Sequence, residues 1–100
     1  MYEVLYSNRF KASVKRCRKQ GKDLALLWDT VKLLMEEGKL PAYYSSHLLH
    51  DEYAGYWECH IEDDWLLVWK QNDKKLTLVL TDTGSHDSLF RKKSSVVLNP

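Results

Sequence analysis

Four histidines and a group of carboxylates supply the residue types in this chain that suit acid–base chemistry. His60 lies between Glu58 and Asp64, while His47 and His86 are more distant along the chain. Imidazole has an unperturbed pKa of about 6.5, so it can exist in either protonation state near neutral pH. Because the set includes no nucleophilic Ser or Cys, it favours general acid–base catalysis.

Each of these residues also has a purely structural interpretation. A single histidine in a strand is more often a hydrogen-bonded structural residue than a catalyst, and Asp64 could simply cap the turn at Glu62-Asp63. Cys59, His60 and His47 could ligate zinc, but the chain has no CxxC, HxxxH or HExxH spacing. The glycines do not have the spacing of a nucleotide-binding loop. We therefore expect neither a metal nor a cofactor.

Hydrophobic spacing predicts the elements that must position these residues. Residues 3–6 form a short β-prone stretch, and Ser7 or Asn8 is suited to cap the helix that follows. A second helix has apolar residues at helical spacing and ends at Gly38, where a left-handed residue is wanted. Because only about two residues separate the helices near Gly21, we expect an antiparallel hairpin.

The second half of the chain predicts strands. Residues 42–55 indicate a long aromatic loop, and three strands follow at about residues 56–61, 65–70 and 75–81. The middle strand is apolar on both faces and should lie centrally in the sheet. The order βααβββ predicts an α+β fold, with an N-terminal strand and a two-helix hairpin packed on a mainly antiparallel four-stranded sheet.

This fold brings distant residues together. The end of one strand, the start of the next and the C-terminal turn would meet, so we expect His60, Asp64 and His86 to converge. Glu58 shares a strand face with His60 because the two are two residues apart. The aromatic loop would add His47.

The composition is that of one small globular domain, with 44% hydrophobic and 29% charged residues. The longest apolar run, residues 65–69, is far shorter than the about 18 residues of a membrane span. The chain opens without a basic-then-apolar leader, and Cys17 and Cys59 fit a reducing compartment. We therefore expect a cytoplasmic protein with no membrane partner.

Positive charge is concentrated in the first helix, although the net charge is only +1. Residues 9–22 contain seven basic side chains and no acidic one: Arg9, Lys11, Lys15, Arg16, Arg18, Lys19 and Lys22. Residues 51–64 contain six acids and no Lys or Arg. Such asymmetry indicates a polyanion or an acidic partner, while a solvated helix face is the simpler alternative.

Two segments carry a more specific combination of motifs. They are GYWECHIEDDWLLV at residues 55–68 and TGSHDSLF at residues 83–90. These motifs resemble those of the RelE superfamily of bacterial toxins, specifically the YafQ branch. On this resemblance we divide the chain into a toxin domain, residues 1–90, and a basic C-terminal tail, residues 91–100.

The resemblance implies a type II toxin that cuts mRNA on the ribosome and forms a hetero-oligomer with a DinJ- or RelB-like antitoxin. The implied reaction needs no metal, because the RNA 2′-hydroxyl attacks the neighbouring phosphorus with the help of an acid and a base. The implied active-site residues are His47, His60, Asp64, His86 and Phe90, with Glu58 at the position of a further acidic residue.

Roles within this set also follow from the resemblance. His86 is assigned as the general acid and His47 as the general base, and the two could be exchanged. His60 and Asp64 would be positioning and charge partners, while Phe90 would stack on or orient a base. Each proton-transfer group is worth typically ~10²–10⁴-fold in rate.

Three positions depart from the pattern of the family. Trp57 and Asp82 stand where relatives commonly have Arg, and Leu48 replaces a proline after the loop histidine. The two lost cations would hold the scissile phosphate. We expect RNA to be bound instead by cations of the first helix, of one strand and of the tail: Arg9, Lys11, Lys15, Arg16, Arg18, Lys19, Lys70, Arg91, Lys92 and Lys93.

The same departures support an alternative function. A protein with this fold could bind a partner without catalysis, as a ParE-like gyrase inhibitor or a weakened toxin. ParE-like proteins generally lack the histidine set, whereas Trp57 and Asp82 are consistent with weakened catalysis. A metal hydrolase is a third possibility, which only chelator-sensitive activity would support.

Overall fold

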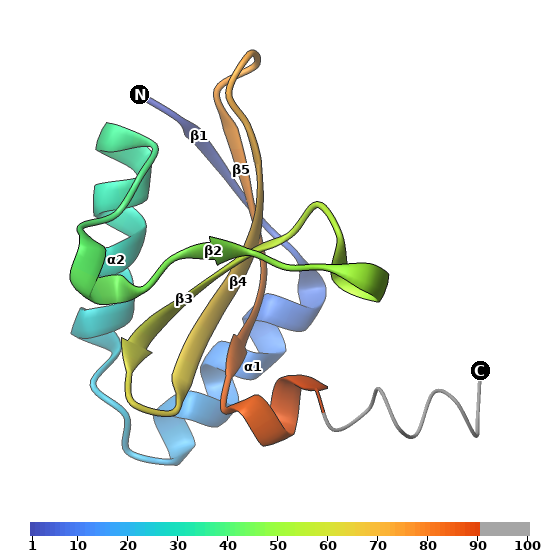
Figure 1. The fold of residues 1–100 in the computed structure, drawn as a ribbon. Helices are drawn as coiled ribbons and strands as arrows, with labels where there is room; N and C mark the ends of the chain where they lie inside the picture. Colours follow the sequence, from blue (N-terminus) through green and yellow to red (C-terminus); the bar gives the residue numbers. More distant parts are fainter. Residues whose placement is uncertain (91–100) are drawn as a thin grey trace.

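The computed structural model describes residues 1–90, and residues 91–100 lie outside the description (Figure 1). The elements in chain order are β1 (Glu3–Tyr6), α1 (Asn8–Lys19), α2 (Leu24–Glu37), a 3₁₀ turn (Ala42–Tyr44), β2 (His47–Leu48), a second 3₁₀ turn (Asp51–Tyr53), β3 (Trp57–Glu62), β4 (Trp65–Asn72) and β5 (Thr77–Gly84). Residues 86–90 then form a helical turn. The predicted α+β fold is confirmed.

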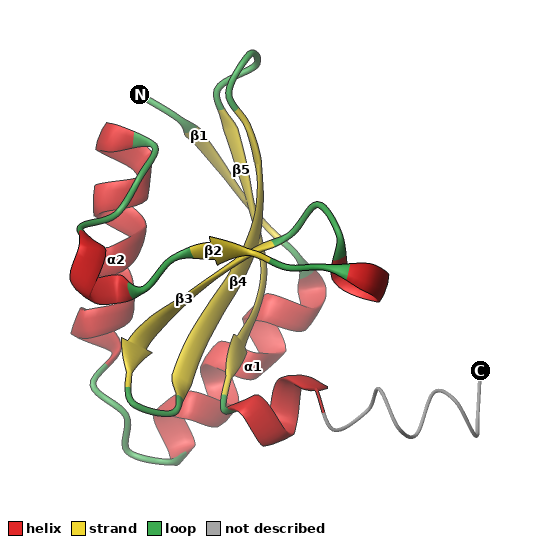
Figure 2. Ribbon diagram, in the orientation of Figure 1, coloured by secondary structure: helices red, strands yellow, loops and turns green. Residues whose placement is uncertain are grey.

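The strands form one five-stranded sheet in the order β1-β5-β4-β3-β2. β1 pairs with β5 in parallel, and the other neighbours are antiparallel (Figure 2). β4 is central, as its two apolar faces predicted. The prediction of four strands missed β2, because a two-residue strand within an irregular segment has too few residues to show alternation.

Side chains and one glycine set the helix ends. The Ser7 hydroxyl accepts from the Phe10 amide at 2.9 Å, and the Asp23 carboxylate accepts from the Ala25 amide at 3.0 Å. Such caps satisfy amides that have no partner within the helix. Gly38 ends α2 with φ 70°, a conformation that disfavours side chains with a Cβ. The two-helix prediction is therefore confirmed, and Ser7 and Gly38 have their predicted capping roles.

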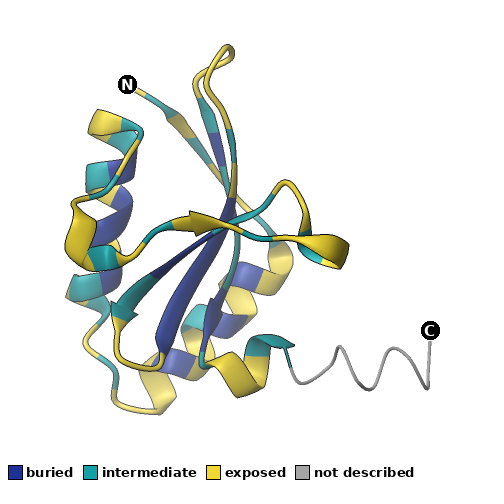
Figure 3. Cartoon of the chain, in the orientation of Figure 1, coloured by how far each residue is buried: buried dark blue, intermediate teal, exposed yellow. Residues whose placement is uncertain are grey.

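The core lies between the helices and one face of the sheet (Figure 3). α1 packs on β5 and α2 on β3, so the hairpin covers this face at two places. We call it the helix-covered face; its fully buried strand residues are Cys59, Trp65, Leu67, Trp69, Leu78 and Leu80. Burial raises the pKa of the Cys59 thiol to about 12, so it is protonated and unsuited to nucleophilic or metal chemistry.

The opposite side of the sheet is called the site face, and it carries Glu58, His60, Leu66 and Val68. It is also partly covered, because Leu66 is fully buried and Val68 is 6% exposed. Tyr53 and Phe90 line a hollow with Val68, so the 3₁₀ segment and the C-terminal turn shield this end of the sheet. Such a cover fits the burial of β4 on both of its faces.

The turn between β4 and β5 differs from the prediction. The strand expected from residue 75 begins at Thr77, because the Asn72 side chain accepts from the amides of Lys74 and Lys75 and extends the turn. Leu76 lies in that turn with φ 53° and is 43% exposed. Among residues 1–90, no helix is long and apolar enough to cross a membrane.

Candidate active site

β3 places two of the expected residues on the site face. Glu58 and His60 are two positions apart in one strand, so their side chains point to the same side. Cys59 lies between them and points into the core. The zinc set considered from the sequence is therefore not assembled, because Cys59 is on the helix-covered face.

β2 brings His47 to Glu58. The two residues are opposite each other in the antiparallel register, and His47 Nε2 lies 3.1 Å from Glu58 Oε1. The Glu58 side chain is only 5% exposed, whereas that of His47 is 52% exposed. His47 Nδ1 also lies 3.1 Å from the Ser45 carbonyl, so both ring nitrogens of His47 face acceptors.

The helical turn after β5 brings His86 to Asp64, which lies in the β3–β4 turn. Asp64 Oδ1 accepts from the His86 amide at 3.0 Å and lies 2.9 Å from His86 Nδ1. These two hydrogen bonds from His86 lower the pKa of the Asp64 carboxyl. Asp64 therefore stays ionised in the working range and orients the imidazole, which the alternative of a turn cap does not explain.

The two histidines face each other across the site. The rings of His60 and His86 have centroids 5.6 Å apart, and His60 Nδ1 lies 3.3 Å from the Asp63 carbonyl. In both rings Nδ1 is therefore engaged and Nε2 is left for chemistry. The expected convergence of His60, Asp64 and His86 is what the structure shows.

Phe90 continues the site from His86. Its ring centroid is 6.2 Å from that of His86 and 5.3 Å from that of Tyr53, which meets it edge-on. Ser85 supports this turn, because its hydroxyl accepts from the Ser88 amide at 3.1 Å. An aromatic wall beside imidazoles is suited to stack on an RNA base.

The cations expected to bind RNA are spread over several surfaces. Lys11, Lys15, Arg18 and Lys19 are exposed on α1 away from the histidines. Arg9 lies 3.7 Å from Asp82 and borders the hollow beside Phe90, while Lys70 lies over the ring of Tyr56 at 4.9 Å. Arg91, Lys92 and Lys93 lie outside the described residues.

A groove of about 750 Å³ lies between the end of α1, the β3–β4 turn and the end of β5. Its lining includes two cations, Arg16 and Lys22, and three carboxylates, Glu62, Asp63 and Asp64. Two cations thus border a hollow beside Asp64, and they share it with three carboxylates, so the charge of this groove is mixed.

Asp82 is bonded to α1. It accepts from the Ser13 hydroxyl at 2.5 Å and from the Thr83 amide at 2.8 Å, in addition to the ion pair with Arg9. The carboxylate thereby joins β5 to the first helix. Asp82 is therefore a structural link that also neutralises a neighbouring cation, Arg9.

Sequence reasoning missed the backbone partners of the histidines. The carbonyls of Ser45 and Asp63 fix which ring nitrogen of His47 and His60 is engaged. Every residue has a backbone carbonyl, so residue type does not show which carbonyl will contact a histidine. These two contacts could be found only from the register of β2 and the conformation of the β3–β4 turn.

Comparisons with known proteins point to one family. A family model described as a bacterial toxin of the type II toxin-antitoxin system, YafQ, matches residues 2–91. The mRNA interferase toxin YafQ of Escherichia coli (strain B / BL21-DE3) is 37% identical over 89 residues, which cover 88% of this chain and 95% of the relative.

Two solved structures extend the comparison. The E. coli DinJ–YafQ complex contains a chain with TM-score 0.81 and 35% identity, with 90% of this chain and 99% of that chain covered. A metal-bound toxin from Helicobacter pylori has TM-score 0.82 and 36% identity, with 90% and 100% covered.

Proposed function

The chain belongs to the YafQ family of bacterial type II toxins, and from this premise we propose that it is an endoribonuclease that cleaves mRNA on the ribosome without a metal. The observation that carries the proposal is the His86–Asp64 pair facing His60 beside buried Glu58. Such a substrate places the protein in the cytoplasm.

RNA cleavage needs two proton transfers, one to a base and one from an acid. The RNA 2′-hydroxyl attacks the adjacent phosphorus while a base takes its proton, and the 5′ oxygen leaves as an acid protonates it. The products are a 2′,3′-cyclic phosphate and a 5′-hydroxyl end. His60 and His86 are suited to these two transfers, because each has Nδ1 engaged by an acceptor and Nε2 facing the site.

His47 has a different place in this mechanism. Both of its ring nitrogens are engaged by acceptors, whereas the general base that the resemblance implied needs a ring nitrogen directed at the substrate. We assign it instead as a positioning residue that holds the Glu58 carboxylate. His60 then takes the role of base opposite His86, and Phe90 stacks on a base of the RNA.

We propose that the RNA and the antitoxin bind the same cations. Arg16 and Lys22 are the two cations of the groove beside Asp64 and would be its phosphate contacts, and the cluster at residues 91–93 remains a prediction from sequence. The E. coli relative is solved as a DinJ–YafQ complex. A cognate DinJ-like antitoxin with an acidic segment would cover the same cations and form a hetero-oligomer with this chain.

The decisive experiment is primer-extension mapping of mRNA cut by the purified chain, with and without ribosomes. We expect cleavage that leaves 5′-hydroxyl ends and that falls by at least ~10²-fold in His86→Ala. His50→Ala is the matched control, because His50 lies outside the contacts described above. Equal cleavage by wild type and His86→Ala would overturn the assignment.

A second candidate function is metal-dependent hydrolysis, which the metal-bound H. pylori neighbour suggests. The two candidates differ in one measurement. Cleavage that survives EDTA supports the proton-transfer mechanism, whereas cleavage that EDTA abolishes and zinc restores supports the metal hydrolase. Growth arrest that persists in His86→Ala, with no RNA cut, would instead support a non-catalytic binding protein of the same fold.

A further inference from the structure

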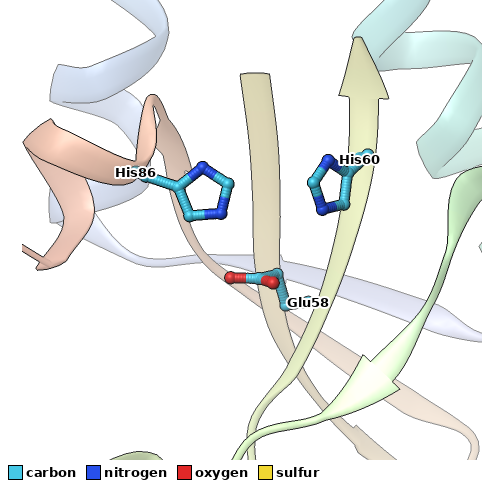
Figure 4. A group of neighbouring side chains, drawn as sticks. All are labelled: Glu58, His60 and His86. Atoms are coloured by element: carbon cyan, nitrogen blue, oxygen red, sulfur yellow. The ribbon is translucent and has the colours of Figure 1, made fainter. Parts of the chain in front are cut away.

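We propose that Glu58, His60 and His86 form a binding site for one Zn²⁺ ion, and that zinc bound there inhibits the protein. One ligand atom from each of the three residues lies within 4.8 Å of the other two. Figure 4 shows the two imidazoles facing each other with the Glu58 carboxylate between them. Glu58 and His60 come from β3, and His86 comes from the C-terminal turn. Because the ligands are far apart in the sequence, the site has no short sequence motif.

Hydrogen bonds already set both imidazoles for metal binding. Histidines that bind metals almost always donate their other ring N–H to a carboxylate or a carbonyl, which fixes the tautomer. His86 Nδ1 lies 2.9 Å from Asp64 Oδ1, and His60 Nδ1 lies 3.3 Å from the Asp63 carbonyl. Each ring thus has Nδ1 engaged and leaves Nε2 for the ion.

Glu58 completes the donor set with a buried negative charge. His47 Nε2 is bonded to its Oε1, which holds the carboxylate as an outer partner would and leaves Oε2 for a ligand. The side chain is 5% exposed, so its charge is poorly screened by water. A cation near the two imidazoles would neutralise it.

The donor set selects the metal. Two imidazoles and one carboxylate suit Zn²⁺ or Cu²⁺, whereas Mg²⁺ and Ca²⁺ prefer oxygen ligands. In a tetrahedral zinc site with bonds of ~2.1 Å, the ligand atoms are about 3.4 Å apart. The ligand atoms here lie within 4.8 Å of one another, so each pair must move closer by at most about 1.4 Å. The half-exposed His86 ring can make this adjustment by side-chain rotation.

Inhibition follows from the identity of the ligands, and this part rests on the proposed function. A zinc ion on the Nε2 atoms of His60 and His86 occupies the positions where the two protons must be taken and given. Loss of either proton transfer is worth ~10²–10⁴-fold in rate. We therefore expect stoichiometric zinc to reduce RNA cleavage at least ~100-fold.

The binding experiment uses the tag-free full chain and the metals alone. Zn²⁺ is titrated by calorimetry, and Co²⁺ is used as an absorption probe of tetrahedral coordination. We expect one ion per chain for wild type and His50→Gln, no binding for His60→Gln or His86→Gln, and affinity ~10–100-fold lower for Asp64→Ala. Binding by both His60→Gln and His86→Gln at wild-type affinity would overturn the site.

The activity experiment separates this inference from the proposed function. RNA cleavage is measured with Zn²⁺, with Mg²⁺ and after EDTA. Inhibition by zinc that EDTA reverses, with no effect of magnesium, supports the inference; zinc binding that leaves cleavage unchanged overturns the inhibitory role. If no condition yields cleavage, the proposed function fails, while calorimetry still decides whether the zinc site exists.

Discussion

Cys59 and His60 are neighbours in β3, yet they belong to two different surfaces. The helix-covered face around Cys59 is apolar and closed, and its strand side chains are almost completely buried. The site face around His60 holds a buried carboxylate and half-exposed imidazoles. One face supplies stability and the other supplies chemistry, so substitutions on the two should have separable effects.

The largest expected effect is on the site face. His60→Ala should reduce RNA cleavage by ~10²–10⁴-fold, because one of the two proton transfers is lost. Its thermal unfolding should change little, since the ring is partly exposed and makes one long hydrogen bond to the Asp63 carbonyl. Cys59→Ala is the matched neighbour and should keep the cleavage rate. A His60→Ala protein that cuts RNA at the wild-type rate would contradict the claim that the site face supplies the catalytic groups.

The converse test is on the helix-covered face. Leu67 is fully buried in the central strand, so Leu67→Ala should lower the free energy of unfolding by ~2–5 kcal/mol, measured by urea denaturation. Cleavage per folded molecule should remain within about twofold of wild type, because the cavity lies on the side away from the histidines. A large loss of activity in fully folded Leu67→Ala would show that the two faces are coupled.

Thr83 lies opposite Leu67 in the β4–β5 register and should give an intermediate effect. Its buried hydroxyl accepts from Trp65 Nε1 at 2.9 Å and donates to the Leu66 carbonyl at 2.7 Å. Thr83→Val removes both of these buried hydrogen bonds, which costs ~1–3 kcal/mol of unfolding free energy.

The matched control for this change is Thr81→Val. The Thr81 hydroxyl donates only to the Val79 carbonyl of its own strand at 3.1 Å, so a smaller loss is expected. If the two variants lose the same free energy of unfolding, the buried Trp65–Thr83 hydrogen bond contributes no more to stability than the Thr81 bond.

The helix-covered face was largely predictable from sequence. Helical spacing and the caps Ser7, Asp23 and Gly38 determine α1 and α2, because local hydrogen bonds and one apolar stripe suffice. Strand ends were less predictable, since Asn72 lengthens its turn through side-chain bonds that propensity does not describe.

The site face was predictable only in part. The convergence of His60, Asp64 and His86 follows from strand order alone. The bond between His47 and Glu58 depends on the register of β2, a strand too short to recognise, and the role of Asp82 depends on Ser13 across the helix. Each of these contacts is a single hydrogen bond between residues far apart in the sequence. Such a contact leaves no periodic pattern of residues from which it could be predicted.

The smallest expected effect concerns the exposed carboxylate that orients His86. Asp64→Asn should reduce cleavage about 10-fold, less than the ~10⁴-fold known for the buried orienting aspartate of a serine protease, because water screens Asp64. The lowered pKa of Asp64 predicts a pH dependence as well. A depressed pKa in the folded state stabilises the fold above the ordinary Asp value of about 3.9, and this contribution is lost as the pH falls through the folded pKa.

Thermal unfolding of wild type and Asp64→Asn should therefore be compared from pH 7 to pH 2.5. We expect wild type to be more stable at pH 6, and the two curves to converge as the Asp64 carboxyl is protonated at the acidic end. Asn keeps the shape of the side chain, so the difference reports the charge. A stability difference that is as large at pH 2.5 as at pH 6 would show that Asp64 holds His86 by shape alone, and the distinction between a structural and a chemical surface would then fail at this residue.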